Sequence, residues 1–226
     1  MEGQAPAEAP AEAPAGETPS EGAGSQTQEI DVGGLLSAAE EAYVSLTSLR
    51  ASFLQVMEVP LLERSSRGTG VWYQKGRDRF RMDFEDPPDD EIVADGTYLW
   101  IYHPSQTPRQ VIRAELASEG TDSGTADLLA RILSEARTAY ASSYDGRESV
   151  DGVETHVVTL TPLGRSPYRL VRVWIAPGDQ LVRRFQIVEV NESIRTITLS
   201  NLEPNAALAD SLFRFTVPPG ADVFSG

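Results

Sequence analysis

The segment of residues 68–104 constrains the fold more than any other part of the chain, because it holds four short strand-like runs that are rich in aromatic residues and separated by turn signals. Phe80, Met82 and Phe84 are separated by single charged residues, which is the pattern of a strand with one buried face and one face in water. The dipeptide 95–96, Asp-Gly, predicts a tight hairpin, because both central residues of a type I′ turn need positive φ. The segment therefore predicts short antiparallel strands.

The next run of this segment is apolar on both faces. Tyr98, Trp100 and Tyr102 occupy one side of the predicted strand, and Leu99 and Ile101 occupy the other. Such a strand is either covered twice or has one face that lines an apolar cavity. The sequence leaves both alternatives open.

The remaining chain predicts many strands and few helices. An apolar stripe at three- and four-residue spacing predicts a helix over 34–50, and a second amphipathic run predicts one over 125–138. A turn or short helix is expected at 205–211. The expected strands are 51–59, 69–75, 79–85, 91–95, 98–103, 109–114, 140–146, 154–161, 168–176, 181–190, 193–202 and 213–217.

This pattern predicts a mainly β (α+β) protein with an antiparallel sheet that curls. Large aromatic residues occur in almost every expected strand, whereas a small closed barrel alternates large and small interior residues. The aromatics favour a wide, open sheet whose concave side is plugged by an amphipathic helix. A well-packed β-sandwich is the alternative.

Charge divides the chain into two parts. The net charge is −15, which argues against nucleic acid as a partner. Residues 1–31 are rich in Ala, Pro and Glu and hold seven acids and no base, so the rest carries −8. We expect 1–31 to be a disordered tail, either solubilising or a tether, and 32–226 to be one folded domain.

Targeting signals are not evident. No apolar run reaches the ~20 residues of a membrane-spanning helix. The first residues lack the basic start and apolar stretch of a signal peptide, so the chain is predicted to be either cytosolic or a processed form.

Catalytic and metal motifs are not evident either. The chain has no cysteine, and neither His103 nor His156 has an acid at metal-ligand spacing. The acidic run 85–91 lacks the pattern of a calcium loop and is typical of a turn. We therefore predict no enzyme activity, no metal and no cofactor.

A series of short motifs runs through nearly the whole predicted domain, in the segments 53–55, 68–70, 80–84, Pro87, 92–96, 99–104, 157–162 and 213–223. The most specific are the Asp-Gly to Leu-Trp-x-Tyr-x-Pro run and the Phe-x-Phe to Pro-x-Gly-x-x-Val ending. In these motifs and in their order, the chain resembles the LolA family of periplasmic lipoprotein carriers.

The resemblance implies an incomplete antiparallel β-barrel of about 11–12 strands, with an N-terminal helix and a helical lid over the concave face. It implies a monomeric carrier, located in the periplasm, that shelters the acyl chains of lipoproteins. Its partners would be acylated lipoproteins, an inner-membrane ABC-type release complex and an outer-membrane acceptor. The signal peptide or lipid anchor of such a carrier is not present in this sequence.

Alternation and the resemblance together give a predicted acyl-chain site. Phe80 matches a family aromatic implicated in the carrier cavity. The other predicted residues share the expected face of Phe80, lie on a neighbouring strand or belong to the predicted lid. The predicted lining is Phe53, Tyr73, Phe80, Met82, Phe84, Trp100, Leu128, Leu129, Ile132 and Leu133. For each residue, an ordinary core position is the alternative.

Three departures from the family pattern carry expectations. An Arg-Pro pair that latches the lid in relatives is replaced by Gly76-Arg77, so Arg77, or less directly Lys75, is the latch candidate. Leu61-Leu62 is either an exposed pair that inserts into a membrane or a buried loop anchor. The chain stops at Gly226, so we expect no additional C-terminal strand.

Two other functions remain open at this point. One is a membrane-anchored lipoprotein acceptor of the same fold, with the Ala/Pro-rich tail as a spacer to a lipid anchor. The other is an envelope module that senses lipids or binds a regulatory protein.

Overall fold

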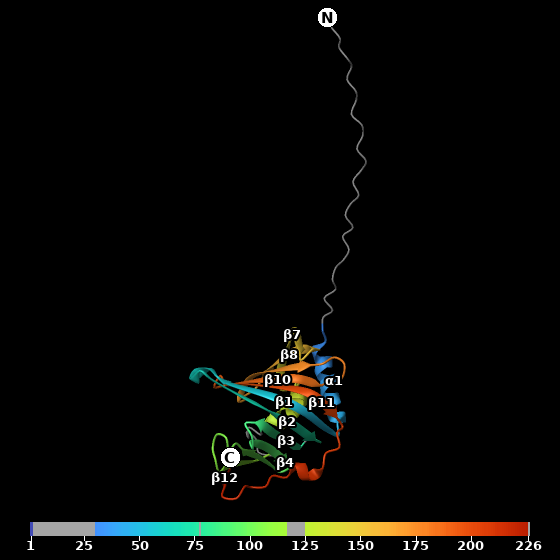
Figure 1. The fold of residues 1–226 in the computed structure, drawn as a ribbon. Coiled ribbons are helices and arrows are strands. Elements are labelled where there is room, and N and C mark those ends of the chain that lie inside the picture. Colours follow the sequence, from blue (N-terminus) through green and yellow to red (C-terminus); the bar gives the residue numbers. More distant parts are fainter. Residues whose placement is uncertain (2–29, 77, 117–124, 226) are drawn as a thin grey trace.

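A computed structural model describes Met1 and residues 30–76, 78–116 and 125–225. Within these ranges the chain forms one open, curved sheet of twelve strands with two α-helices and two short 3₁₀-helices (Figure 1). The sheet order is β12-β6-β5-β4-β3-β2-β1-β11-β10-β9-β8-β7. All neighbouring strands are antiparallel except β12 and β6, so the predicted incomplete barrel is confirmed.

The strands follow the predicted order along the chain, and most boundaries agree to within a few residues. Their bounds are β1 Ser48–Val59, β2 Arg64–Lys75, β3 Arg79–Asp86, β4 Glu91–Asp95, β5 Tyr98–Tyr102, β6 Gln110–Glu115, β7 Tyr140–Val150, β8 Val153–Pro162, β9 Tyr168–Ile175, β10 Val182–Glu189, β11 Ile194–Pro204 and β12 Asp222–Ser225. The helices are α1 Val32–Ser45, η1 Pro60–Leu62, α2 Thr125–Glu135 and η2 Asp210–Phe213.

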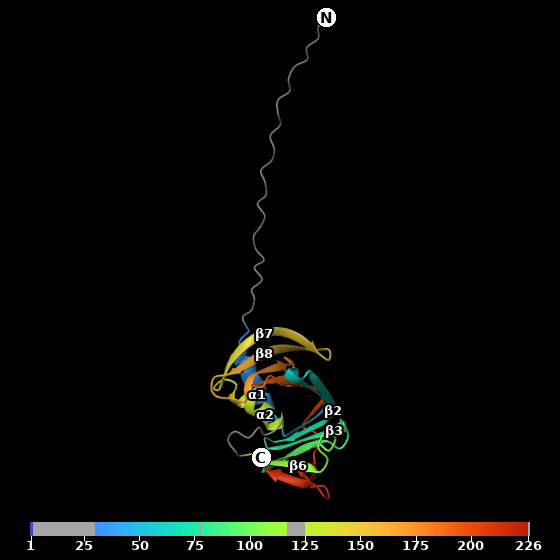
Figure 2. The same cartoon turned by 90° about the vertical axis from the view of Figure 1, so that its left-hand side faces the viewer.

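Both α-helices lie on the concave side of the sheet. Helix α1 begins after Asp31, whose side chain accepts a hydrogen bond from the Gly34 amide at 2.9 Å and so caps the helix. Figure 2 shows α1 and α2 between the β7–β8 limb and the β2–β3 limb of the curved sheet. Helix α1 packs on α2, and α2 packs on β3. The N-terminal helix and the helical cover predicted from the sequence are therefore present.

The first helix is shorter than predicted. It ends at Ser45, and Ser48 already pairs with Lys75 in the sheet. Asn205 accepts hydrogen bonds from the amide and hydroxyl of Thr47, both at 3.0 Å, and holds the turn between helix and strand. The apolar stripe continues to Leu49, but this residue contributes to the core from β1. The pairing of β1 with β2 therefore ends the helix earlier than the local periodicity predicted.

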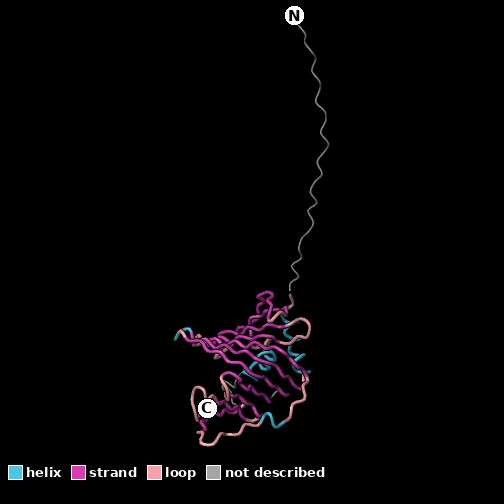
Figure 3. Tube along the Cα trace, viewed as in Figure 1, coloured by secondary structure: helices cyan, strands magenta, loops and turns pink. Residues whose placement is uncertain are grey.

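The C-terminal segment differs from both expectations made for it. Residues 214–217 belong to no strand, although the sequence predicted one over 213–217. Residues 222–225 form β12, which pairs in parallel with β6, so the expectation of no additional terminal strand is wrong. A crossing from η2 to the far edge of the sheet makes this parallel pairing possible, and Figure 3 shows the long loop that connects them.

The close approach of β2 and β3 depends on Gly70. A Cβ atom at this position would lie 1.9 Å from the carbonyl oxygen of Asp83, so no other residue fits without movement of the backbone. The pairing register also shifts beside it, between Thr69 and Gly70. The glycine therefore allows β2 and β3 to approach closely where their register shifts.

Candidate functional site

The helices fill one end of the half-barrel with a tightly packed core. Trp72 is fully buried and meets Phe80 and Phe185 edge to face, with ring centroids 4.5 and 6.1 Å apart. Helix residues close this end from the concave side. Among the described residues, the helices contribute the buried side chains Leu36, Ala39, Tyr43, Leu129, Ile132 and Leu133, and the buried Ala136 directly follows α2.

Most of the predicted lining residues belong to this packed end. Phe53, Phe80, Met82, Leu129, Ile132 and Leu133 all join one apolar cluster, each at most 3% exposed. Phe80, Met82 and Phe84 share the inner face, as the alternation predicted. The sequence brought the right residues together, but the structure places most of them in a core rather than on a cavity wall. The side chain of Leu128 lies outside the described part.

Tyr73 and Trp100 lie on the other face of the sheet, so their assignment to the inner lining is wrong. Tyr73 pairs with Arg81, and Trp100 pairs with Val93, which itself pairs with Arg81. These positions are opposite in parity to Met82. Trp100 stacks on Phe215 of the C-terminal segment, with centroids 5.2 Å apart. The strand that is apolar on both faces is therefore covered twice, by the core inside and by this segment outside.

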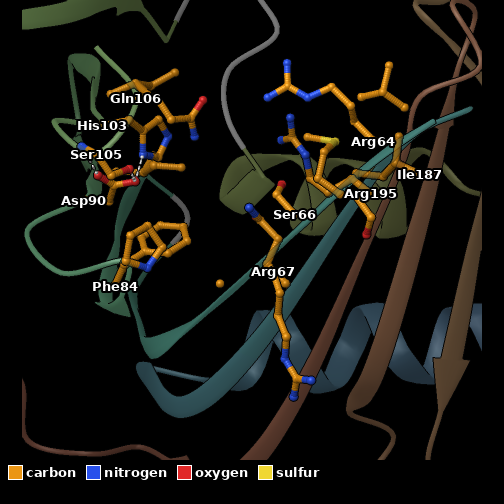
Figure 4. Close-up of a pocket in the computed structure, with 18 of the residues that line it drawn as sticks. Arg64, Ser66, Arg67, Phe84, Asp90, His103, Ser105, Gln106, Ile187 and Arg195 are labelled. Atoms are coloured by element: carbon orange, nitrogen blue, oxygen red, sulfur yellow. Dashed lines mark hydrogen bonds and ion pairs between the residues drawn. The ribbon is translucent and has the colours of Figure 1, made fainter. Parts of the chain in front are cut away.

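A cavity of about 720 Å³ opens at the opposite end of the half-barrel (Figure 4). Its volume lies within the range of small-molecule binding sites. The apolar part of the wall comes from the ends of strands that enter the packed core elsewhere. It consists of Met57, Val59, Leu62, Phe84, Pro87, Ile92, Ile101, Tyr168 and Ile187.

Among the predicted lining residues whose side chains the structure describes, only Phe84 reaches this cavity. It bridges both regions, because its ring meets Phe53 of the core at 4.9 Å and His103 of the cavity at 5.7 Å. Sequence reasoning missed the rest of the wall. Met57 continues the alternation that begins with Phe53, and this signal was available to extend the lining along β1.

One side of the cavity carries a buried polar network. Asp90 is 2% exposed and accepts hydrogen bonds from the amide and hydroxyl of Ser105 at 3.1 and 2.7 Å. Nδ1 of His103 lies 3.0 Å from Asp90 Oδ2, an arrangement in which Nδ1 carries the proton. Burial lowers the pKa of His103 and outweighs the opposing effect of Asp90. Asp90 thus fixes the loop that bounds the cavity.

The hairpin between β1 and β2 projects beyond the rest of the sheet (Figure 1). Leu61 and Leu62 lie at its tip and are 73% and 63% exposed. The pair is exposed, so the alternative of a buried loop anchor is wrong, and insertion into a membrane stays a prediction. Leu62 also borders the cavity, so the apolar tip and the opening adjoin one another.

In the described ranges, no three or more His, Cys, Asp or Glu side chains gather as a metal site requires. No described helix is long and apolar enough to cross a membrane.

Comparison with known proteins identifies the family. The model of the family described as outer membrane lipoprotein carrier protein LolA matches residues 44–216, more than half of the chain. The chain belongs to the LolA family. The match begins inside α1 and includes β1 to β11, the second helix and both ends of the half-barrel.

Relatives of this LolA-family chain carry the same description at low identity. An outer-membrane lipoprotein carrier protein of Neisseria meningitidis is 25% identical over 194 residues, covering 85% of this chain and 87% of the relative. One of Alkalilimnicola ehrlichii is 29% identical over 184 residues, covering 80% and 79%. The fold resembles that of an uncharacterized conserved protein from Thermus thermophilus, with a TM-score of 0.52, 12% identity and coverage of 86% and 98%.

The lid-latch candidates of this LolA-family chain have different outcomes. Arg77 lies outside the described residues, so its role stays a prediction. Lys75 does not reach the helices: its Nζ donates to the Leu208 carbonyl at 2.8 Å and to Asp210 at 2.7 Å. Arg79 joins the same carboxylate at 3.0 Å. Lys75 therefore fastens the C-terminal segment to the outer face instead of the lid to the inner one.

Proposed function

We propose that this protein is a carrier that shields the acyl chains of lipoproteins in the cavity at the open end of the half-barrel. The observation that carries the proposal is a cavity of about 720 Å³, with an apolar part and a polar part to its wall, in a member of a lipoprotein carrier family. Transfer of a sixteen-carbon chain into water costs on the order of 12 kcal/mol, at ~0.8 kcal/mol per methylene. A lipoprotein therefore needs such a shield to cross an aqueous space.

The wider setting of the proposal follows from the family. The carrier would work in the periplasm as a monomer, without a cofactor, metal or catalytic step. It would receive cargo from an inner-membrane ABC-type release complex and pass it to an outer-membrane acceptor. Residues 32–226 would form the carrier domain, and residues 2–29 of the predicted tail lie outside the described part of the structure.

The structure changes the best test of acyl binding. Phe80 lies in the packed core, so Phe80→Glu would damage folding as well as any site. Met57 is a better target, because it lines the cavity and is only half buried. Its neighbour Val56 has similar exposure but points to the outer face. The pair Met57→Asp and Val56→Asp therefore introduces the same charge on opposite faces of one strand.

We expect Met57→Asp to reduce retained acylated cargo at least about tenfold. A bound acyl chain would displace water from the new carboxylate and offer it no hydrogen bonds in return. Val56→Asp should retain cargo at the level of the unmodified protein. Native mass spectrometry of protein from a periplasmic preparation measures cargo per molecule. Equal cargo in the two variants would exclude the cavity as the acyl site.

A membrane-anchored acceptor remains a second candidate, supported by the exposed Leu61-Leu62 pair beside the cavity opening. An apolar tip of this kind is suited to enter a bilayer surface. Vesicle flotation of the protein and of Leu61→Gln tests this candidate. Loss of flotation only in the variant would favour it, and no flotation of either protein would exclude this role for the tip.

A further inference from the structure

Two arginines of the cavity wall, Arg64 and Arg195, lie on the inner face of the sheet. Arg195 pairs with Met57, which pairs with Ser66, and Ile187 pairs with Arg195 on the other side. Arg195 therefore occupies the inner face between two apolar wall residues. A charge at such a position is costly unless it has a role, because guanidinium groups lose solvation there.

Arg64 is on the same inner face. It pairs with Val59, two residues beyond Met57, and both Val59 and Arg64 line the cavity. Figure 4 shows Arg64 and Arg195 extending their guanidinium groups into the opening, across from His103 and Gln106. Burial is the main cause of the lowered pKa of His103, and the positive charge of Arg195 lowers this pKa as well. This effect is consistent with Arg195 facing His103 across the cavity.

Two carboxylates, Asp90 and Glu189, line the cavity with these arginines. Asp90 already accepts from Ser105 and faces His103. Glu189 is the other carboxylate that lines the cavity, and each guanidinium offers five N–H donors. Arg64 has no hydrogen-bond or ion-pair partner among the described residues. Donors of Arg64 therefore remain for a ligand.

The geometry points to a binding site for the anionic head of an amphiphile, with Arg64 and Arg195 holding the head and the apolar wall holding the chain. The site suits a phosphate or carboxylate attached to an acyl or alkyl chain, because planar guanidinium groups bind such oxyanions through paired hydrogen bonds. This inference rests on the proposed acyl cavity and narrows its cargo to chains linked to a negative charge.

The net charge of the protein would by itself favour cationic ligands, so it separates the inferred site from a general charge effect. With a net charge of −15, the whole molecule attracts cations and repels anions at low salt. A preference for an anionic amphiphile would run against this field and must come from local groups. Exposed guanidinium groups are screened by salt, so the preference should weaken as ionic strength rises.

The chain supplies a matched control on the same strand. Arg67 carries the same charge, is exposed like Arg64, and has no partner among the described residues. It pairs with Val56 of the outer face, and in Figure 4 its side chain turns away from the other two arginines. Arg67 also borders the cavity, but its guanidinium group does not point toward the other two. Arg67→Gln therefore changes the net charge as Arg64→Gln does, without removing a guanidinium group that extends into the opening.

Isothermal titration calorimetry of the full chain with two probes below their micelle concentrations tests the inference. We expect dodecyl phosphate to bind about tenfold or more tightly than dodecyltrimethylammonium at low salt. Arg64→Gln and Arg195→Gln should each weaken dodecyl phosphate binding about tenfold. Arg67→Gln should leave it within about twofold. Arg64→Gln keeps the test valid if Arg195→Gln fails to fold, because Arg64 is exposed.

Three results would overturn the inference in distinguishable ways. Equal binding of the two probes, with no effect of either arginine, would leave the acyl cavity intact and remove the anionic head site. No binding of either probe would remove the proposed acyl cavity itself. Binding of inorganic phosphate alone with the affinity of dodecyl phosphate would assign the arginines to a free anion.

Discussion

The two ends of the half-barrel use the same strands in different ways. On the inner face of β1, Leu49 and Phe53 are at most 3% exposed, whereas Met57 and Val59 further along the strand line a cavity. On β11, Leu199 is buried, but Arg195 faces the opening. The helices cover only the first end. The difference shows that this sheet is filled where a helix packs on it and hollow where none does.

The packed end should respond most strongly to loss of volume. Phe185 is fully buried against Trp72, so Phe185→Ala should lower the free energy of unfolding by about 3–5 kcal/mol. Urea denaturation followed by circular dichroism measures this change.

Met57→Ala is the control at the hollow end and should cost below about 1.5 kcal/mol, because Met57 is only half buried beside existing space. Equal costs at the two sites would mean that the ends do not differ in packing.

The junction between the two regions should respond less strongly. In Gly70→Ala, the new Cβ would meet backbone atoms of Asp83 and Phe84 within 3 Å, which forces β2 and β3 apart. We expect a loss of about 1–3 kcal/mol in the free energy of unfolding, measured in the same way. Gly178→Ala is the control, since nothing lies within 4 Å of its added Cβ. A neutral Gly70→Ala would show that the bend at this position needs no glycine.

The smallest predicted effect is at the hollow end, where the protonation of His103 makes the free energy of unfolding depend on pH. Burial holds the pKa of His103 below its ordinary value, so near and below pH 6.5 the unfolded chain binds a proton that the folded chain does not. Stability is therefore present above about pH 6.5 and is lost as pH falls toward the folded pKa.

Urea titrations of the protein and of His103→Gln at pH 7.5 and 5.5 measure this dependence. The protein should lose stability relative to the variant at the lower pH. A gain at pH 5.5 would mean that Asp90 outweighs burial, with the pKa of His103 raised instead.

Local alternation predicted a large part of the fold. The shared face of Phe80, Met82 and Phe84 and nearly all strand positions follow from a period of two. The same rule did not place Trp100 and Tyr73, because the register between strands decides which parity faces inward. Nor did it predict β12, whose partner β6 lies more than a hundred residues earlier in the chain.

The sequence by itself determined that this chain forms a curved sheet with two amphipathic helices, and its motifs placed it near the lipoprotein carriers. Only the tertiary structure decided which part of the inner face is a core and which part is a cavity. The reason is physical. Alternation specifies that a face avoids water, but what covers that face depends on helices from distant parts of the chain. Here α1 and α2 reach one end and leave Met57, Phe84, Arg64 and Arg195 around the opening at the other.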